Sequence, residues 1–323
     1  QASTADGIAA ARGLGRLVSS LQNHPTDILV EPSGNGDVFR YNTSNGSFSR
    51  VRRGSDQFGG TTTDLSGEIR ARSEFDFDGG AAYIAQWVRR PATNEWVEVF
   101  RSYARDRDPL SIVAFTNDPD IILVSGARGR DRVAIWEYNV ATRSFADEPA
   151  FAHPLFDAQS VIQSSSPADF GEVIGFTYQA DRPTTYWLDP QLEQIQTQMR
   201  AALSVEMAPV SWVDITSGRR VRFEAPVDAD VRVLDSSQDR SVVAFVRSGP
   251  GQPPEYYLMA NGRARLLGRA YPDININLLG ETRLIQYAAR DGLMIPAFLT
   301  TPDPAQFGEG PYPTIITPHG GPW

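Results

Sequence analysis

The sequence motif most suited to catalysis lies near the C-terminal end, where positions 319–322 read His-Gly-Gly-Pro. The apolar residues Ile315 and Ile316 just before them predict a short buried strand, which Pro318 ends. A glycine-rich loop after such a strand lets a backbone N–H approach a developing oxyanion, the charged group of an acyl-transfer transition state. Residues 319–322 are therefore interpreted as an oxyanion-stabilising loop.

A nucleophile for that reaction is not found in the sequence. Acyl transfer on a strand-and-loop scaffold of this kind uses a serine in the pattern Gly-x-Ser-x-Gly. The only glycines four residues apart are Gly171 and Gly175, and the residue between them is Val173. We therefore expect the catalytic machinery to lie beyond Trp323, and the chain alone to be inactive.

Composition narrows the classes of protein that remain. The 323 residues are 41% hydrophobic and 10% aromatic, which is sufficient to bury a core. A net charge of −9 argues against nucleic acid as a partner, and no apolar run is long enough to span a membrane. The chain has no Cys, which excludes disulfides and thiolate chemistry, and all thirty basic residues are arginine.

Short apolar runs separated by Gly, Asn and Asp turns recur from residue 24 onward, which predicts an all-β chain. Three of these stretches, beginning near residues 28, 121 and 242, share one plan: an apolar strand, a polar turn, an aromatic-rich strand and a basic strand. That repeat is typical of β-propeller blades, which take ~40–45 residues each. The predicted strands are 27–30, 38–41, 48–51, 69–75, 82–89, 96–100, 112–115, 121–124, 133–138, 173–178, 185–188, 220–223, 231–234, 242–246, 256–259 and 265–267.

Three segments follow from these patterns. Residues 1–23 are predicted to form an N-terminal arm or helix, because residues 9–22 space their apolar side chains as a helix does. Residues 24–281 are predicted to be a propeller of about five blades, interrupted by a helix over 190–203 that packs on a blade, with a recognition role as the alternative. After residue 281 a hairpin with its turn at Asp291-Gly292 starts a new sheet, so residues 282–323 are assigned to a second domain.

The residues of this second segment resemble the opening of the catalytic domain in the prolyl oligopeptidase family of serine peptidases. The likeness is carried by residues 287–302, which include Ala-Arg-Asp-Gly-Leu-Met-Ile-Pro, and by 313–323 with the His-Gly-Gly-Pro motif. Residues 181–203 and 247–258 resemble the bacterial acylaminoacyl-peptidase-like members. The resemblance implies a substrate-gating β-propeller followed by the first strands of an α/β-hydrolase domain. Relatives carry another blade or two before the stretch that resembles residues 16–30, so the propeller is expected to be incomplete.

The resemblance also implies a reaction and the parts that carry it. The parent protein would hydrolyse short peptides, as an acylaminoacyl- or oligopeptidase, by acyl transfer to a serine, and the family's Ser, Asp and His would lie beyond this chain. Gly321 is the expected oxyanion donor and Gly320 the second candidate, with His319 and Pro322 as structural parts of the loop. His319 as a catalytic base is the disfavoured alternative. No cofactor is implied.

The expected partners are a short peptide and the α/β-hydrolase domain, either on the same polypeptide or as a cleaved partner chain; an oligomer is compatible with the sequence. A stand-alone propeller that binds a protein or ligand and an esterase or lipase are the alternatives, although the latter tends to carry His-Gly-Gly-Gly. Because the chain begins at Gln1, an upstream segment is expected to have been removed, and the bacterial periplasm is slightly favoured over the cytoplasm.

Several other patterns have plainer interpretations. Residues 76–80, Asp-Phe-Asp-Gly-Gly, are interpreted as a hairpin turn, because a calcium loop would need Glu where Trp87 stands. The arginines of 50–53 and 128–132 are interpreted as solvated hairpin tips, with attraction of a substrate carboxylate as the alternative. Residues 105–108 predict surface ion pairs. The three histidines have no metal-ligand spacing, and the tryptophans are assigned to packing.

Overall fold

A computed structural model of the chain describes residues 15–32, 36–55, 57–180, 182–214 and 217–318. The chain divides into two compact units, one of residues 1–165 with 169–178 and the other of residues 166–168 with 179–323. The boundary that the sequence predicts between residues 281 and 282 therefore stays a prediction.

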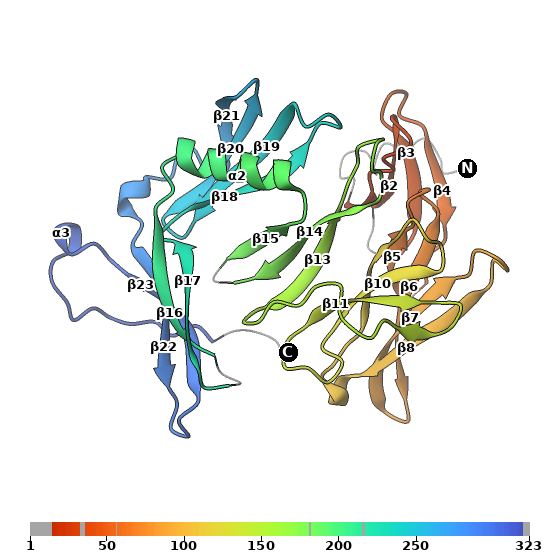
Figure 1. Ribbon diagram of the computed structural model, residues 1–323, viewed down its shortest axis with the longest axis horizontal. Coiled ribbons are helices and arrows are strands. Elements are labelled where there is room, and N and C mark those ends of the chain that lie inside the picture. The colour runs from red at the N-terminus through yellow and green to blue at the C-terminus, as the bar shows by residue number, and fades with distance from the viewer. Residues whose placement is uncertain (1–14, 33–35, 56, 181, 215–216, 319–323) are drawn as a thin grey trace. The chain divides into compact units, whose positions relative to one another are not determined.

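The first unit is built from antiparallel sheets in which each strand pairs with the next one along the chain, and Figure 1 shows them in red to yellow-green. The four-stranded sheets are β1–β4, β5–β8 and β9–β12, and β13 and β14 belong to a further sheet. The elements are β1 (Arg16–Ser19), β2 (Asp27–Glu31), β3 (Val38–Asn42), β4 (Phe48–Arg52), β5 (Phe58–Thr63), β6 (Ile69–Asp78), β7 (Ala81–Arg89), β8 (Trp96–Tyr103), η1 (Ala104–Asp106), β9 (Ser111–Phe115), β10 (Ile121–Gly126), β11 (Ala134–Asn139), β12 (Ser144–Phe145), β13 (Asp157–Gln163) and β14 (Val173–Gln179).

The second unit combines one more four-stranded sheet of the same plan, β18–β21, with two hairpins and a helix. Both hairpins, β16–β17 and β22–β23, are antiparallel. The elements are β15 (Pro183–Trp187), α2 (Pro190–Ala202), β16 (Met207–Val213), β17 (Arg220–Pro226), β18 (Asp230–Ser236), β19 (Val242–Gly249), β20 (Gln252–Ala260), β21 (Arg263–Arg269), η2 (Ile276–Leu278), β22 (Glu281–Ala288), β23 (Met294–Thr301) and α3 (Pro304–Phe307).

The strand β10 is buried on both faces, as the inner part of a propeller blade requires. On β10, Ile122 and Val124 pack into a core shared with the sheet β5–β8, whereas Leu123 between them packs with β13 and β14. Alternate residues of a strand point to opposite faces, so a continuous apolar run buries both. The prediction of an all-β chain with about five propeller blades is confirmed.

The helix α2 begins where the sequence places it and packs on a blade, as predicted. Asp189 caps its N-terminus by accepting hydrogen bonds from the backbone N–H groups of Gln191 (2.8 Å) and Leu192 (3.1 Å), and Pro190 fills the first helical position. Ile195 and Met199 pack against β18 and β19. The packing interpretation of residues 190–203 is therefore confirmed.

Two of the turns that join the first and second strands of a sheet close in the same way, one in each unit. The backbone N–H of Thr116 donates to the carbonyl oxygen of Ile121 (3.3 Å), and that of Ser237 donates to Val242 (2.8 Å). In both turns the first residue's hydroxyl also donates to that carbonyl, at 3.1 and 3.2 Å. A hydroxyl at the first position therefore holds each six-residue connection closed.

Of the predicted N-terminal arm or helix, the helix is not formed in the described part. Arg16–Ser19 is β1, an edge strand that pairs with β2, with Leu17 opposite Val30. Its short apolar pattern fits a strand as well as a helix, and the ladder to β2 decides between them. The rest of the predicted arm, residues 1–14, lies outside the described residues.

Candidate functional site

The predicted oxyanion loop, residues 319–322 with Gly321 and Gly320 as donors, lies outside the residues that the structure describes. The structure does describe the hairpin that leads toward it. The strands β22 and β23 pair without a shift from Glu281 opposite Thr301 to Ala288 opposite Met294. The hairpin predicted from the sequence is therefore formed.

The turn of this hairpin lies where the Asp-Gly pair predicts it. The Oδ1 atom of Asp291 accepts a hydrogen bond from the backbone N–H of Leu293 (3.0 Å), and Gly292 takes a left-handed φ of 88°. Most side chains disfavour that backbone conformation, whereas glycine adopts it freely. The Asp-Gly chemistry thus fixes the register of the hairpin.

The strand predicted at Ile315 and Ile316 is not formed, and these side chains are 91% and 85% exposed. A strand needs a neighbour to accept and donate its backbone hydrogen bonds. No described strand pairs with residues 313–318. The prediction that this segment is buried is therefore wrong for the described chain.

The β22–β23 hairpin exposes apolar side chains on both of its faces. The pair Leu284 and Phe298 lies on one face and the pair Tyr287 and Ile295 on the other, because adjacent residues of a strand point in opposite directions. Phe298 is 60% exposed and Tyr287 is 50% exposed. A sheet with two apolar faces is typical of folds in which helices cover both sides.

One side chain fixes this hairpin to its own unit. The amide of Gln286 donates to the carbonyl oxygen of Val213 in β16 (2.9 Å) and accepts from the N–H of the same residue (2.8 Å). This double hydrogen bond repeats the pairing that a neighbouring strand would make. These two hydrogen bonds therefore help to set the position of β22 relative to β16.

A cavity of about 660 Å³ lies at the base of the hairpin. Its charged residues are Asp228, Glu281, Arg283, Asp303 and Glu309, so its lining is mainly acidic. The Oδ1 atom of Asp228 accepts from the N–H of Gly251 (3.0 Å), and Arg283 lies 3.6 Å from Glu281. The described lining includes no Ser or His, so it offers no nucleophile and base for acyl transfer.

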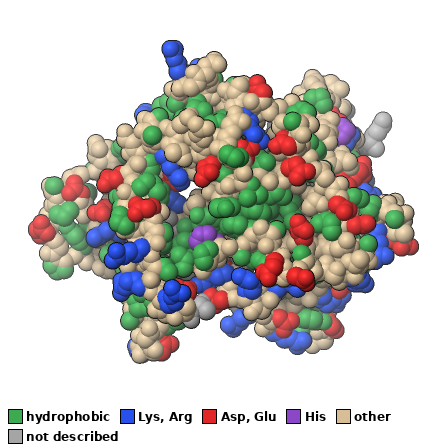
Figure 2. All heavy atoms as spheres, in the orientation of Figure 1, with side chains coloured by type: hydrophobic (Ala, Val, Ile, Leu, Met, Phe, Trp, Pro, Cys, Tyr) green, Lys and Arg blue, Asp and Glu red, His purple; other side chains and the backbone are tan. Residues whose placement is uncertain are grey.

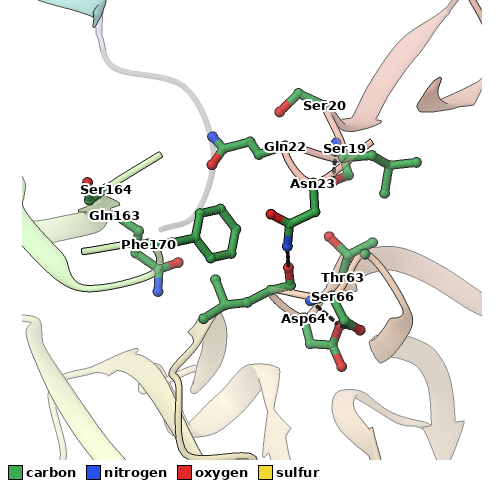
Figure 3. A pocket seen from close by; sticks show the side chains of 13 residues that line it. Ser19, Ser20, Gln22, Asn23, Thr63, Asp64, Ser66, Gln163, Ser164 and Phe170 are labelled. Carbon is green, nitrogen blue, oxygen red and sulfur yellow. Dashed lines mark hydrogen bonds between the residues drawn. The ribbon is translucent and has the colours of Figure 1, made fainter. Parts of the chain in front are cut away.

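A second recess, of about 280 Å³, lies in the first unit and is shown in Figure 3. It is formed by the connections β1–β2, β5–β6 and β13–β14, and Phe170 points into it. Its polar groups hold the surrounding connections in place. Asn23 donates to the carbonyl oxygen of Leu65 (3.0 Å), and Asp64 accepts from the hydroxyl of Ser66 (2.6 Å). The recess is therefore stabilised from within rather than arranged around a reacting group.

Residues 76–80 form a hairpin turn, as predicted. Asp78 pairs with Ala81 across the β6–β7 connection, and Gly79 and Gly80 both have positive φ angles, 54° and 85°. Two successive residues with positive φ are the signature of a type I′ hairpin turn.

Within the described ranges, no group of three His, Asp or Glu residues could hold a metal ion. No described helix has both the length and the apolar character that crossing a bilayer requires.

The arginine clusters differ in how exposed their side chains are. Figure 2 shows basic and acidic side chains intermixed on the visible face. Arg128 lies at an exposed hairpin tip, where its guanidinium stacks 3.8 Å from the ring centre of Phe145. Arg105 is exposed beside Asp106 at 3.7 Å, a surface ion pair as predicted. Arg52 is not a solvated tip: it is half-buried at the end of β4 and donates to Thr61 and to the carbonyl oxygen of Phe58.

The tryptophans pack as predicted. Trp136 and Trp212 are buried. The indole N–H groups of Trp87 and Trp187 donate to Glu74 (2.7 Å) and Gln196 (2.9 Å). An indole that is buried, or whose N–H is satisfied within the fold, is a structural residue, so these four side chains are assigned to packing.

His153 is the described histidine with the most enclosed surroundings. Its Nδ1 atom accepts hydrogen bonds from the N–H groups of Leu155 and Phe156, both at 3.1 Å. Its ring stacks on Tyr178, with the ring centres 4.4 Å apart. Burial lowers the pKa of His153 below its ordinary value of 6.5. The neutral ring is therefore part of the turn that begins at His153, and Nδ1 has no capacity left to act as a base.

Acid is expected to weaken the first unit through His153. The folded state favours the neutral ring, so below pH ~6.5 the unfolded chain binds more protons than the folded chain does. The free energy of unfolding that the neutral ring contributes above that pH is therefore lost as the pH falls. Protonation removes two acceptor bonds, which predicts a loss of up to about 1 kcal/mol by pH ~5. Urea denaturation of wild type and of His153→Asn, at pH values from ~7.5 to ~5, measures this loss in the free energy of unfolding. Parallel curves for the two proteins would contradict the assignment, and His24→Asn serves as the control.

Comparisons with known proteins give structural likeness only. No protein-family model matches the chain, and no curated protein matches it. Similar solved structures include prolyl oligopeptidase B from Galerina marginata, at 11% identity and a TM-score of 0.45, over 88% of this chain and 38% of that one. A puromycin-hydrolyzing peptidase of Mycobacterium tuberculosis is 12% identical at a TM-score of 0.45, over 86% and 42% of the two chains.

TolB from Acinetobacter baumannii is also similar, at 13% identity and a TM-score of 0.39, over 76% of this chain and 51% of that one. The chain thus spans about half or less of the length of these proteins. At such identities and TM-scores the likeness assigns neither a family nor an activity to this chain.

Proposed function

We propose that this chain is the propeller part of a serine peptidase of the prolyl oligopeptidase family, with an acylaminoacyl- or oligopeptidase activity toward short peptides. The observation that carries the proposal is the β22–β23 hairpin with its Asp-Gly turn, which joins the motif residues of 287–302 into one element after the blade sheets. In sequence this hairpin precedes the His-Gly-Gly-Pro of residues 319–322. A propeller that only bound a ligand would not require either feature.

The exposed apolar faces of the hairpin support a partner domain. Phe298 and Leu299 are neighbours on β23 that point to opposite faces, and both are exposed, as are Tyr287 and Leu293. Each of these partly exposed side chains would gain a part of the about 1.5–3 kcal/mol that full burial of such a side chain provides. The partner that fits is the rest of an α/β-hydrolase domain, on the same polypeptide or as a cleaved partner chain, because that fold covers its sheet on both faces.

In the proposed reaction this chain contributes charge stabilisation and access control. A serine of the hydrolase domain attacks the peptide carbonyl while a histidine of that domain takes its proton. The N–H of Gly321 donates to the oxyanion, and Gly320 is the second candidate. His319 and Pro322 shape the loop. The propeller admits short, flexible peptides and keeps folded proteins from the serine.

The test compares the 323-residue chain with the full-length natural polypeptide. Full-length protein should hydrolyse a chromogenic acyl-peptide and react with a fluorophosphonate probe for active serines, whereas the chain alone should do neither. Gly321→Pro removes the donor N–H and should lower kcat/KM by about 10²–10³-fold. Pro322→Ala, in the same loop, should change it far less.

Each alternative has its own outcome in this test. A full-length protein that binds peptides without probe labelling or hydrolysis would leave only the stand-alone binding module. Cleavage of p-nitrophenyl esters with no cleavage of acyl-peptides would favour an esterase instead.

A further inference from the structure

Two arginines of the first unit, Arg52 and Arg72, both lie next to Thr61. Arg52 ends β4, and its guanidinium donates to the hydroxyl of Thr61 in β5 and to the carbonyl oxygen of Phe58 at 3.4 Å. Thr61 pairs directly with Arg72 of β6 across the ladder. The two guanidinium groups are therefore brought together where the end of β4 meets the sheet β5–β8.

Aromatic rings fix the guanidinium plane of Arg72. Its central carbon lies 3.8 Å from the ring centre of Phe58, 4.3 Å from that of Trp96 and 5.8 Å from that of Trp87. Cation–π contacts of this kind hold a guanidinium in place without using its N–H groups. The buried Nε atom of Arg72 has no hydrogen-bond partner, and neither terminal nitrogen is among the buried unpaired atoms of the described residues.

The carboxylates nearest to the two arginines are turned to other partners. Glu74 accepts from the indole of Trp87 at 2.7 Å and from Tyr83 at 3.5 Å. Glu31 is held by Arg16 at 2.6 Å. Within the described part of the chain, no carboxylate forms an ion pair with Arg52 or Arg72, although many other arginines there have one.

This arrangement leaves the positive charge of two half-buried arginines only partly compensated, because Glu31 acts on Arg52 and Glu74 acts on Arg72 without forming an ion pair. Burial, and after it the charge on Arg52, lowers the pKa of Arg72, and burial lowers that of Arg52. Two neighbouring cations that form no ion pair destabilise the folded state, and a bound anion would reduce that cost. The chain as a whole has a net charge of −9, so this local excess of positive charge runs against its composition.

We propose that Arg52 and Arg72 form a binding site for a carboxylate group. A guanidinium presents parallel N–H donors that match the two oxygens of a carboxylate, and a plane held by aromatic rings loses little freedom when it binds. The carboxylate could come from the C-terminus of a peptide or from a small free acid. The site does not depend on the proposed peptidase function.

The test titrates the 323-residue chain with N-acetyl-dialanine, its C-terminal amide, acetate and phosphate, with chloride added to keep the ionic strength constant. Fluorescence of Trp87 and Trp96 reports binding beside Arg72, and calorimetry provides a second readout. The free acid should give a saturable change, and the amide should bind at least ~10-fold more weakly. Arg52→Gln and Arg72→Gln should each weaken binding at least ~10-fold.

Arg50→Gln is the matched control, because Arg50 lies in the same strand but faces Asp37 at 3.8 Å, and it should bind as wild type does. If a glutamine variant does not fold, Arg72→Lys keeps the charge without the planar fork and should still lose ~10-fold. Equal binding of acetate and the peptide acid would identify a small acid as the source. No saturable change in wild type by either readout, stronger binding of phosphate, or equal competition by chloride would overturn the proposal.

Discussion

Replacing Phe245 by alanine is expected to lower the free energy of unfolding of the second unit by about 3–5 kcal/mol. Phe245 lies in β19 and is fully buried among Val231, Val243, Ile195 and Met199. Its ring fills the space between the sheet β18–β21 and α2. Truncation removes the apolar contacts and leaves a cavity that a sheet covered by a helix cannot close.

Urea denaturation followed by circular dichroism measures this loss. Tyr256→Ala is the control, because Tyr256 is an exposed aromatic residue on the neighbouring strand β20, opposite Val246. Its cost should stay below about 1 kcal/mol. Equal losses from the two variants would mean that the core under α2 is not the main source of stability in this unit.

Asp189→Ala should cost about 3 kcal/mol, because one carboxylate has two roles. It caps α2, which is worth about 1 kcal/mol. It also lies 2.5 Å from the guanidinium of Arg240, and both side chains are largely buried. Removing the carboxylate leaves the arginine charge without this partner, and that loss costs more than the cap does.

Two variants separate the roles of Asp189. Asp189→Asn keeps an oxygen that can cap the helix and loses only the ion pair, so its cost should be clearly smaller than that of alanine. Asp303 caps the short, exposed α3 by accepting from Ala305 at 2.9 Å, and Asp303→Ala should cost less than about 1 kcal/mol. Thermal denaturation ranks the three proteins, and an Asp303→Ala loss as large as that of Asp189→Ala would refute the buried-pair argument.

Strands with apolar, β-branched runs could be predicted from sequence, and those with mixed composition could not. The alternation in β7 and β19 gave their positions within a few residues. By contrast, β5 contains Gly59 and Gly60 and β16 contains Pro209, residues that normally argue against a strand. Pairing with β6 and β17 overrides those local preferences. Asp157–Gln163 was missed because its polar residues resemble a loop.

The candidate sites show a different limit. The hairpin turn at Asp291-Gly292 was predictable because its chemistry is local. The meeting of Arg52 with Arg72 was not, because it depends on how β4 approaches the next sheet, and the local sequence around Arg52 indicates only a charged turn. The rings around Arg72 come from β5, β7 and β8, so its local sequence carries no signal of a packed guanidinium.

The matching turns that begin at Thr116 and Ser237 have a consequence for how such a chain can change over time. Each six-residue connection closes through its own backbone and its own hydroxyl. A unit that carries its own closure can be duplicated, lost or exchanged as a block while the sequence between its fixed points drifts. Thr116–Ile121 and Ser237–Val242 share only the aspartate at their third positions, Asp118 and Asp239, yet they perform the same closure. The two connections are thus more alike in their hydrogen bonds than in their sequences.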